Sequence, residues 1–292
     1  FLHSHVDVRS IKRFKIVVDC GNGMAGLVMP KLVAELPIEV EFLFANINMT
    51  FPNHEANPIK DETLAVLKKR VVESHADFGV AFDGDGDRIS FVTSDGIRVP
   101  AEYILALFAE HFLKAQPGAA VVYDLRASRV VAELIQKAGG KPVESRVGHT
   151  YVRALMREHE AIVGGEISGH FYFKYFFHAD SGIFAFLKLL ELLSAGEKSL
   201  GELVRPLQKY ASSGEINIQV SDRERAIDAV AAHFKDAPQI RYLDGLSIEY
   251  PDFWFNIRAS NTEPLLRLVV EAKEKQVVDA KVEEIKLIIV DK

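Results

Sequence analysis

The segment Phe78-Gly-Val-Ala-Phe-Asp-Gly-Asp-Gly-Asp-Arg88 contains the pattern on which the fold is built. Its first five residues predict a buried strand, and three carboxylates follow at alternate positions where that strand ends. Upstream lie a strand-like segment at Lys15–Asp19, a glycine turn, an amphipathic segment at Pro30–Glu35, a strand at Ile38–Phe44 and a helical pattern at Asp61–His75. Strands that alternate with helices in this way predict a sheet of mostly parallel strands with helices on both faces.

The same alternation continues beyond residue 98. Helices are expected at Ala101–Leu113, Arg129–Lys137, Thr150–His159 and Asp180–Ala195, and strands at Ala119–Asp124 and Pro142–Arg146. The segment Ala161–Gly164 leads into a polar loop that begins at Gly165. The order then changes to a series of strands, at Glu215–Val220, Arg241–Leu243, Leu246–Tyr250, Phe253–Arg258 and Leu265–Ala272. Two helices accompany them: one begins with the capping box Ser221-Asp-Arg-Glu224, and the other closes the chain at Gln276–Ile288. We therefore predict an α/β protein: two α/β domains with mixed, largely parallel sheets, residues 1–98 and 99–210, plus a C-terminal α+β domain, residues 211–292.

The composition excludes several classes of protein. The 292 residues include 35 Lys and Arg against 41 Asp and Glu, and a net charge of −6 gives no electrostatic reason to expect nucleic acid as a partner. The most apolar stretch, Ile183–Leu193, is too short to span a bilayer, so no membrane segment is expected. The single cysteine, Cys20, excludes an intramolecular disulfide and fits a reducing compartment, so we expect a cytoplasmic protein with Cys20 in its core.

The acidic loop is the strongest functional signal. Asp83, Asp85 and Asp87 are separated by glycines that permit tight backbone curvature, so their carboxylates can converge on one hard cation. A solvated acidic turn is the alternative, but three such close carboxylates repel one another unless a cation lies between them. An EF-hand fits poorly, because Arg88 occupies its glycine position and Ser94 the position of its bidentate Glu. Three carboxylates leave a cation under-coordinated, and Mg²⁺ shared with a phosphate would fit that deficit.

Two other loops are rich in polar side chains. Arg258-Ala-Ser-Asn-Thr-Glu-Pro264 brings together a guanidinium, two hydroxyls and an amide, which can surround a phosphate, although a turn with capping side chains is the alternative. Gly165-Glu-Ile-Ser-Gly-His170 would point Glu166, Ser168 and His170 to one side, where Glu166 can accept hydrogen bonds from two sugar hydroxyls. A buried Glu paired with a nearby Lys would explain Glu166 equally well.

Three further groups lie near predicted strand ends. Arg126 and His149 are candidates for the same site, although a lone His is more often a structural hydrogen-bonding group. The segment Gly21-x-Gly23-x-x-Gly26, with Glu41 twenty residues after its first glycine, nearly matches a dinucleotide-binding fingerprint. Because Glu41 falls inside the strand Ile38–Phe44 and not at its carboxyl end, we interpret this segment as a tight turn. A nicotinamide-dependent oxidoreductase is therefore the weaker hypothesis.

Taken together, the three loops, in this order, resemble the α-D-phosphohexomutase superfamily, and within it the phosphomannomutase/phosphoglucomutase branch. The resemblance runs over nearly the whole chain and implies four domains, three related α/β domains and a C-terminal α+β domain, of which our three predicted domains correspond to the second, third and fourth. It implies a phosphotransferase that interconverts hexose 6-phosphate and hexose 1-phosphate, of mannose or glucose or both. A phosphoserine enzyme and a bisphosphate intermediate carry that reaction in the family.

The resemblance also implies roles for individual residues. Mg²⁺ would be held by Asp83, Asp85 and Asp87, with an oxygen of the phosphoserine as a further ligand, and Arg88 would help to neutralise the transferring group. Glu166 and Ser168 would hold sugar hydroxyls, and the non-reacting phosphate would be clamped by Arg258, Ser260, Asn261 and Thr262. Arg126, His149 and His170 fall where the family places basic groups near the reacting oxygen.

Departures from the family pattern keep alternatives open. The serine loop of the family, Thr-x-Ser-His-Asn-Pro, belongs to the first domain and does not occur in this sequence. We therefore expect a chain that lacks the N-terminal domain that completes the active site. Arg126 stands where relatives often have Lys, and because arginine is a poor proton donor the general acid–base role would fall to His149 or His170. Ile167 stands where the hexose branch often has Met and the phosphoglucosamine branch typically Gln, and a phosphoglucosamine mutase is one alternative. A non-catalytic sugar-phosphate-binding module, which would share the binding loops but need no serine loop, is the other.

Overall fold

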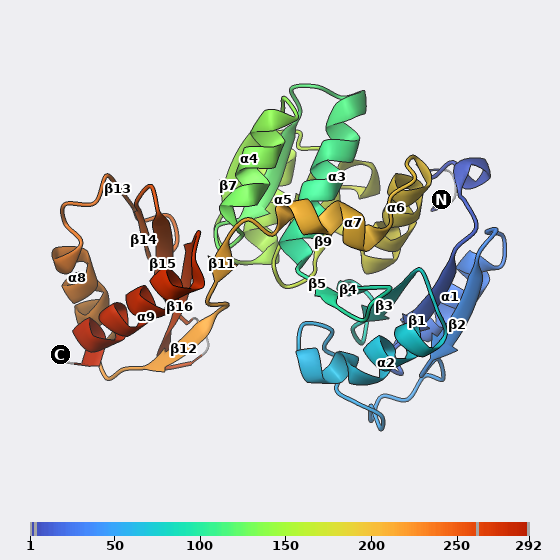
Figure 1. The fold of residues 1–292 in the computed structure, drawn as a ribbon, viewed down its shortest axis with the longest axis horizontal. Coiled ribbons are helices and arrows are strands. Elements are labelled where there is room, and N and C mark those ends of the chain that lie inside the picture. The colour runs from blue at the N-terminus through green and yellow to red at the C-terminus, as the bar shows by residue number, and fades with distance from the viewer. Residues whose placement is uncertain (1, 3–4, 261–262, 291–292) are drawn as a thin grey trace. The chain divides into compact units, whose positions relative to one another are not determined.

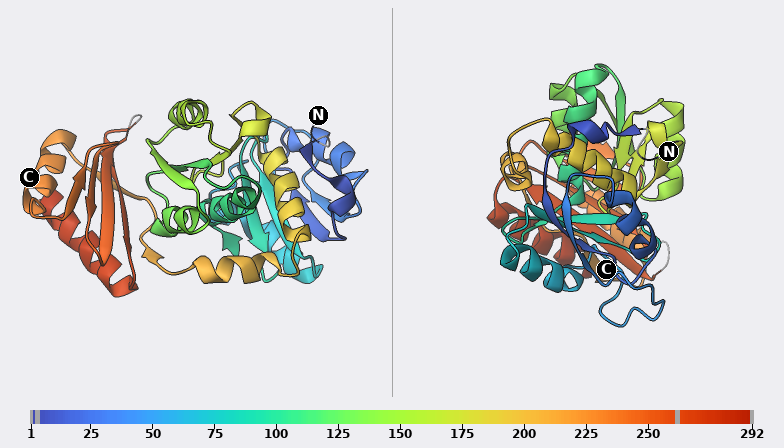
Figure 2. Two further views of the ribbon diagram at one scale, coloured as in Figure 1. Left: turned by 90° about the horizontal axis from the view of Figure 1, so that it is seen from above. Right: turned by 90° about the vertical axis from the view of Figure 1, so that its right-hand side faces the viewer.

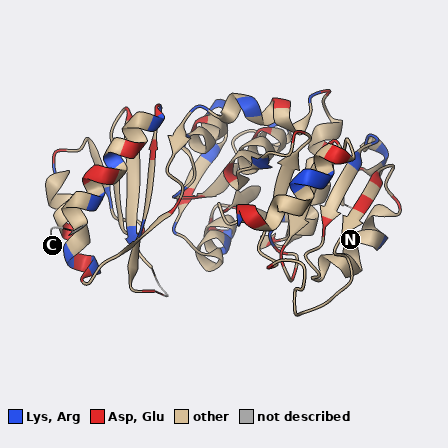
Figure 3. Ribbon diagram, turned by 60° about the horizontal axis from the view of Figure 1, so that its bottom comes forward, with Lys and Arg blue, Asp and Glu red and all other residues tan. Residues whose placement is uncertain are grey.

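The computed structural model describes residue 2, residues 5–260 and residues 263–290. The chain divides into two compact units, Phe1–Leu207 and Gln208–Lys292. Figure 1 shows the order of their elements along the chain. Within the described residues, the first unit contains two five-stranded sheets and the second unit one six-stranded sheet. Lys and Arg are interspersed with Asp and Glu in both units (Figure 3), in keeping with the small net charge.

The first sheet has the strand order β2-β1-β3-β4-β5. Its strands are β1 (Lys15–Asp19), β2 (Glu39–Leu43), β3 (Phe78–Phe82), β4 (Ile89–Thr93) and β5 (Arg98–Val99). Strand β1 pairs in parallel with β2 and β3, whereas β4 runs antiparallel to both β3 and β5. The sequence pattern did not predict β4 and β5, which return from the acidic loop along β3.

The second sheet repeats this arrangement in the order β10-β9-β8-β6-β7. Its strands are β6 (Ala120–Asp124), β7 (Lys141–Ser145), β8 (Val163–Gly165), β9 (Phe171–Phe173) and β10 (Ala179–Asp180). Strand β6 pairs in parallel with β7 and β8, and β9 runs antiparallel to β8 and β10. Each sheet thus has three neighbouring parallel strands followed by two strands that are joined through antiparallel pairings, which confirms the predicted mixed, largely parallel sheets.

The helices of the first unit are α1 (Ala25–Val33), α2 (Ala65–Glu73), which follows a 3₁₀ turn at Asp61–Leu64, α3 (Ala101–Ala115), α4 (Arg129–Lys137), α5 (His149–Glu158), α6 (Gly182–Ser194) and α7 (Leu200–Val204). The predicted start of α1 at Pro30 is wrong, because the helix begins at Ala25. Pro30 lies inside it and removes one helical hydrogen bond, but Ala25 and Met29 are fully buried, and this packing outweighs that loss.

Helix α6 connects the two sheets of the first unit. It is buried along nearly its whole length and contacts both β4 of the first sheet and α3, which packs against the second. Its one lysine, Lys188, is only 6% exposed and donates hydrogen bonds to the His5 carbonyl at 2.6 Å and to the Glu191 carboxylate at 2.7 Å. In the described part of the chain, no helix has the length and apolar composition that crossing a bilayer requires.

The second unit is an antiparallel sheet covered by two helices, which confirms the predicted α+β fold (Figure 2). Its strands are β11 (Ala211–Ser212), β12 (Ile216–Gln219), β13 (Gln239–Arg241), β14 (Leu246–Glu249), β15 (Phe253–Ala259) and β16 (Leu265–Ala272), and its helices α8 (Arg223–His233) and α9 (Lys275–Val290). The core joins Val230 and Phe234, from α8 and its C-cap, to Phe255 of β15 and Ile285 of α9. The side chain that caps α8 is Asp222, one residue after the predicted Ser221.

The sheets of the first unit bring the polar loops to the carboxyl ends of parallel strands. Asp19 ends β1, and Asp83 directly follows β3, which is paired with β1. In the second sheet, Asp124 ends β6 and Glu166 directly follows its neighbour β8. Open α/β sheets bind their ligands at this end of the strands, so the candidate site lies here.

Candidate functional site

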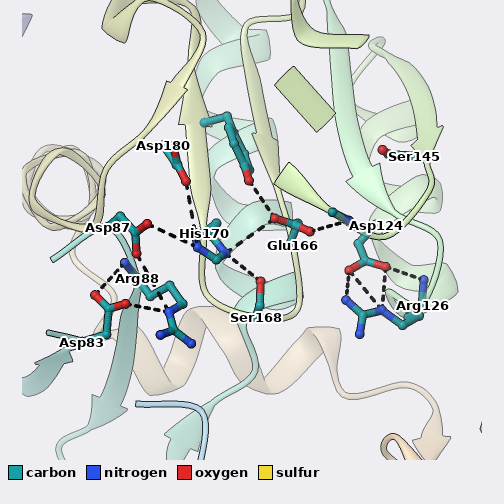
Figure 4. Close-up of polar contacts among 12 residues, drawn as sticks. Asp83, Asp87, Arg88, Asp124, Arg126, Ser145, Glu166, Ser168, His170 and Asp180 are labelled. Carbon is teal, nitrogen blue, oxygen red and sulfur yellow. Dashed lines mark hydrogen bonds and ion pairs between the residues drawn. The ribbon is translucent and has the colours of Figure 1, made fainter. Parts of the chain in front are cut away.

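The acidic loop folds around the buried carboxylate of Asp83 (Figure 4). Asp83 is 1% exposed, and its Oδ1 accepts hydrogen bonds from the backbone N–H groups of Gly86 at 3.0 Å and Arg88 at 3.2 Å. The Arg88 Nε donates to the other oxygen, Oδ2, at 2.6 Å. Ligand atoms of Asp83, Asp85 and Asp87 all lie within 4.8 Å of one another. The loop therefore places three carboxylates where one cation could contact all of them.

The electrostatics of this loop fit a cation. Burial raises the pKa of Asp83 above its ordinary value, and the neighbouring Asp87 carboxylate raises it further. The imidazole of His170 holds the pKa of Asp87 below its ordinary value. The Asp87 Oδ1 is buried and has no hydrogen-bond partner among the described residues. A hard cation would be a partner for this orphaned oxygen, which would become its ligand, and would relieve the repulsion between the carboxylates.

Backbone contacts join the acidic loop to the loop 165–170. Arg88 and His170 form an antiparallel β-bridge, and the Ile89 N–H donates to the Gly169 carbonyl at 3.1 Å. Gly169 has a φ of +88°, and a Cβ there would lie 2.9 Å from the Ile89 carbonyl oxygen. Only glycine combines this conformation with so close an approach. The two loops are consequently fixed to each other by their main chains.

The side chains of Glu166, Ser168 and His170 lie together, as the alternation of residues predicted (Figure 4). Ser168 Oγ is 2.8 Å from the Nδ1 of His170, which is also 3.5 Å from the Glu166 Oε2. The His170 Nε2 faces two carboxylates, with Asp87 at 3.6 Å and Asp180 at 3.9 Å. Burial lowers the pKa of His170, but the surrounding carboxylates outweigh it and the net shift is upward. Asp180 was not recognised from the sequence, which placed it in a helix.

Glu166 is 5% exposed and is held by two donors. The Tyr172 hydroxyl donates to its Oε2 at 2.7 Å, and the Gly148 backbone N–H donates to its Oε1 at 3.1 Å. Within the described residues, the Glu166 carboxylate has no lysine partner, so a Glu–Lys pair does not explain its burial. The carboxylate keeps free lone pairs with which it could accept hydrogen bonds from a ligand.

The other two basic candidates have different surroundings. Arg126 is buried and paired with Asp124, whose Oδ1 accepts from the Arg126 Nε at 2.9 Å and from its backbone N–H at 3.0 Å. His149 begins α5 and is exposed. It is linked to the site through the preceding residue, because Gly148 donates to Glu166. That Arg126 and His149 lie near the reacting oxygen stays a prediction.

The glycine turn after β1 supports the acidic loop. The Met24 N–H donates to the Gly84 carbonyl at 2.9 Å, and a Cβ on Gly23 would lie 2.5 Å from the Gly84 carbonyl oxygen. The turn therefore packs directly on the acidic loop, as a tight turn would. Cys20 is fully buried beside it, as predicted, and burial raises the pKa of its thiol to about 12.

The substitution Gly23→Ala is expected to disturb the acidic loop. Because the added methyl group would displace the backbone at Gly84, we expect the Mg²⁺ affinity to fall about tenfold and the free energy of unfolding to fall by about 1–3 kcal/mol. Isothermal titration calorimetry and chemical denaturation measure the two effects. Gly196→Ala is the matched control, because nothing lies within 4 Å of a Cβ at that position. Unchanged Mg²⁺ affinity in Gly23→Ala would show that the turn does not position the loop.

The remaining predicted residues lie in the second unit. Arg258 is 3% exposed, its NH2 group is 3.0 Å from the Glu215 Oε2, and its buried Nε has no hydrogen-bond partner among the described residues. Ser260 is 2% exposed, and its carbonyl accepts a hydrogen bond from Arg223 at 2.9 Å. Asn261 and Thr262 lie outside the described residues. The contact between Arg223 and Ser260 was not expected from the sequence, because a single arginine in the first turn of a helix has no distinguishing pattern.

Three domain models of one family match the chain in order. They are phosphoglucomutase/phosphomannomutase α/β/α domain II over residues 1–96, α/β/α domain III over residues 100–210 and the C-terminal domain over residues 215–288. The chain therefore belongs to the α-D-phosphohexomutase superfamily. Within it, the matching models are those of the phosphoglucomutase/phosphomannomutase family.

Individual relatives agree with this assignment. The chain is 42% identical over 274 residues to the phosphohexose mutases of Xanthomonas campestris, a match that covers 93% of the chain. It is 40% identical over 275 residues, 94% of the chain, to a phosphomannomutase of Methanocaldococcus jannaschii. In both cases it spans 61% of the relative's length. A crystal structure of a phosphoglucomutase/phosphomannomutase family protein from Burkholderia thailandensis superposes with a TM-score of 0.89 at 33% identity, covering 98% of this chain and 63% of that one.

Proposed function

We propose that this chain contains the metal-binding, sugar-binding and phosphate-binding parts of a phosphohexomutase, which interconverts hexose 6-phosphate and hexose 1-phosphate of mannose or glucose or both. The observation that carries the proposal is the bridge between Arg88 and His170, since it joins the acidic loop to the loop of Glu166. A cation and a sugar bound by these two loops would be neighbours. Relatives named phosphohexose mutases and phosphomannomutase support the same reaction class.

Mg²⁺ is the cation that the donor set fits best. The three side chains offer only carboxylate oxygens, the ligands of hard cations, and three of them leave positions for water and a phosphate oxygen. When bound, Mg²⁺ neutralises the charge that develops on a transferring phosphoryl group. Arg88 would contribute a second positive charge, because its side chain is 28% exposed and it is fixed through Nε by Asp83.

His170 is the better placed of the two candidate general acids and bases. Its Nδ1 is held by Ser168 while its Nε2 faces Asp87, one of the proposed metal ligands. A fixed imidazole beside the cation can hold or release a proton at a sugar oxygen that approaches the metal. Arg126 would act only as a positive charge, since a guanidinium paired with Asp124 does not release its proton.

The second unit would bind the phosphate that does not react. Arg258 is anchored by Glu215, which leaves its other guanidinium donors for a phosphate, and the adjacent loop would supply hydroxyl and amide groups from Ser260, Asn261 and Thr262. The same clamp would serve both hexose 1-phosphate and hexose 6-phosphate. Substrate choice would then depend on the hydroxyls held by Glu166 and Ser168.

Calorimetry on the 292-residue chain tests the proposal. In the presence of Mg²⁺ we expect binding of glucose 1-phosphate and mannose 1-phosphate, with weaker binding of glucosamine 1-phosphate. Arg258→Gln is expected to weaken sugar-phosphate binding about 10- to 100-fold, the effect of losing hydrogen bonds to a charged group. Arg267→Gln is the matched control, because Arg267 also pairs with Glu215 and lies outside the proposed clamp. A chain that binds none of these sugar phosphates, or prefers glucosamine 1-phosphate, would contradict the hexose assignment.

A further inference from the structure

The partner that fixes Glu166 is a tyrosine outside every recognised motif. Tyr172 lies in β9 and is fully buried, in one hydrophobic cluster with Val152 and Met156 of α5 and Val122 of β6. Its hydroxyl donates to the Glu166 Oε2 at 2.7 Å. Because the side chain is fully buried, the position of this hydroxyl is fixed, and Glu166 is the hydrogen-bond partner that it has there. A hydrogen bond from a fixed donor to a carboxylate is short and strong and restricts the carboxylate to one orientation.

The second oxygen of Glu166 reaches the start of α5. Gly148 is the N-cap of this ten-residue helix, adopts a φ of +129° and makes no side-chain capping hydrogen bond. Its N–H instead donates to the Glu166 Oε1 at 3.1 Å, which places a negative charge at the positive end of the helix. Because His149 is the first residue of α5, the carboxylate connects the sugar-binding loop with the backbone that positions His149.

Burial strengthens the hydrogen bond between the Tyr172 hydroxyl and the Glu166 carboxylate. Desolvation raises the pKa of Tyr172 far above its ordinary value, and the charge of Glu166 raises it further, so the phenol remains a proton donor. Tyr172 is fully buried and Glu166 is only 5% exposed, so a carboxylate oxygen that lost its donor there would be costly. Removal of the hydroxyl would therefore leave Glu166 free to turn away from its present orientation.

We propose that Tyr172 is a positioning residue of the sugar site: its hydroxyl orients the Glu166 carboxylate and, through Gly148, the start of α5. Hexose recognition then depends on Tyr172, although its buried hydroxyl does not touch the sugar. This inference rests on the proposed function, in which Glu166 accepts hydrogen bonds from sugar hydroxyls. Tyr172 would contribute to the sugar site only by orienting Glu166. A phenylalanine at this position would fill the same space but could not donate the hydrogen bond to the carboxylate.

The first arm of the test uses the ligand-free chain. In Tyr172→Phe, we expect hydrogen exchange of the Gly148 amide, followed by NMR, to accelerate about tenfold as its acceptor becomes mobile. The amides of other glycines outside the site, such as Gly118 and Gly139, should not change. Tyr242→Phe is the matched control, since it removes the hydroxyl of a side chain that is 68% exposed. An unchanged Gly148 exchange rate in Tyr172→Phe would overturn the proposed positioning.

The second arm measures ligand binding in the presence of Mg²⁺. Tyr172→Phe is expected to weaken glucose 1-phosphate binding about fivefold to tenfold while leaving inorganic phosphate and Mg²⁺ binding unchanged. In a Glu166→Ala background the same substitution should have no further effect, because the residue through which it acts is absent. A loss that persists in that background, or that extends equally to phosphate and Mg²⁺, would show a general structural role and overturn the inference.

The two arms separate this inference from the proposed function. If the unsubstituted chain binds phosphate and Mg²⁺ but no hexose phosphate, the proposed function fails, and Gly148 exchange still decides whether Tyr172 orients Glu166. If hexose phosphates bind and Tyr172→Phe changes neither their affinity nor the exchange rate, the inference alone fails. Should Tyr172→Phe not fold, Gly148 exchange is measured in Glu166→Ala instead. The same acceleration is expected there, because the acceptor of the Gly148 amide is removed. If the exchange rate does not change, Glu166 does not hold the start of α5 and the inference is overturned.

Discussion

Asp85→Asn is expected to lower the Mg²⁺ affinity of the chain by about 100-fold, since it removes one of three carboxylate ligands and one negative charge from the site. Asp85 is the most informative of the three acidic residues. It is exposed, whereas Asp83 is buried in hydrogen bonds with Gly86 and Arg88 that also hold the loop together. A substitution at Asp85 should therefore change metal binding with little change in stability.

Calorimetric titration of Mg²⁺ and thermal denaturation of the same samples test this expectation. Asp236→Asn is the matched control, because Asp236 is an exposed carboxylate of the second unit, outside the acidic loop. We expect it to bind Mg²⁺ as the unsubstituted chain does. If Asp85→Asn bound Mg²⁺ with undiminished affinity, the three carboxylates would not form a cation site and the acidic loop would be a solvated turn.

The 292-residue chain is expected to bind glucose 1-phosphate but to show no mutase turnover of it. The proposed reaction needs a side chain that carries the phosphoryl group between two positions of the sugar. In the family this is the serine of Thr-x-Ser-His-Asn-Pro, which does not occur in the sequence. In the proposed function the residues of this site would orient a phosphate and neutralise its charge, but positioning groups cannot replace a covalent carrier.

An assay that couples glucose 6-phosphate formation to its oxidation measures this turnover. Glucose 1,6-bisphosphate is added in a parallel sample, so that a missing intermediate does not limit the reaction. Calorimetric binding of glucose 1-phosphate to the same preparation is the control for a folded site. Turnover that rises in proportion to the concentration of the chain would contradict the expectation and would mean that another nucleophile in these residues carries the phosphoryl group.

The alternation of elements and the position of the loops could be predicted because both follow from local pattern. Apolar runs such as Phe78–Phe82 are buried on both faces, and the residues that follow them reach the same end of the sheet. For this reason the residue pattern alone was enough to assign the acidic loop to a strand end. The close packing of Gly23 on Gly84 likewise explains the glycine turn without a nucleotide.

Helix starts and short strands were harder to predict. Asp180 and Ser181 are both common N-caps, and in the structure Ser181 caps α6 while Asp180 pairs in β10. The same ambiguity explains why the N-cap of α8 is Asp222 and not the predicted Ser221. Strands of two or three residues, such as β5 and β9, are too short to show a periodicity, and their pairing decides their structure.

The contacts within the site could not be predicted, because they depend on strand pairing. Asp180 reaches His170 because β10 folds back along β9, where Asp180 lies opposite Tyr172. Tyr172 reaches Glu166 because β9 returns antiparallel to β8. Neither contact has a sequence spacing that distinguishes it from chance, so neither Asp180 nor Tyr172 could be assigned to the candidate site from the sequence.

The bridge between Arg88 and His170 has a consequence for engineering. Because the Ile89 amide is satisfied by the Gly169 carbonyl, a chimaera that took its acidic loop from one relative and its glutamate loop from another would have to reproduce this main-chain register as well as the side chains. Exchange of both loops together with their flanking strands would preserve it. In this chain the two segments around Arg88 and His170, although far apart in the sequence, are therefore best transferred as one unit.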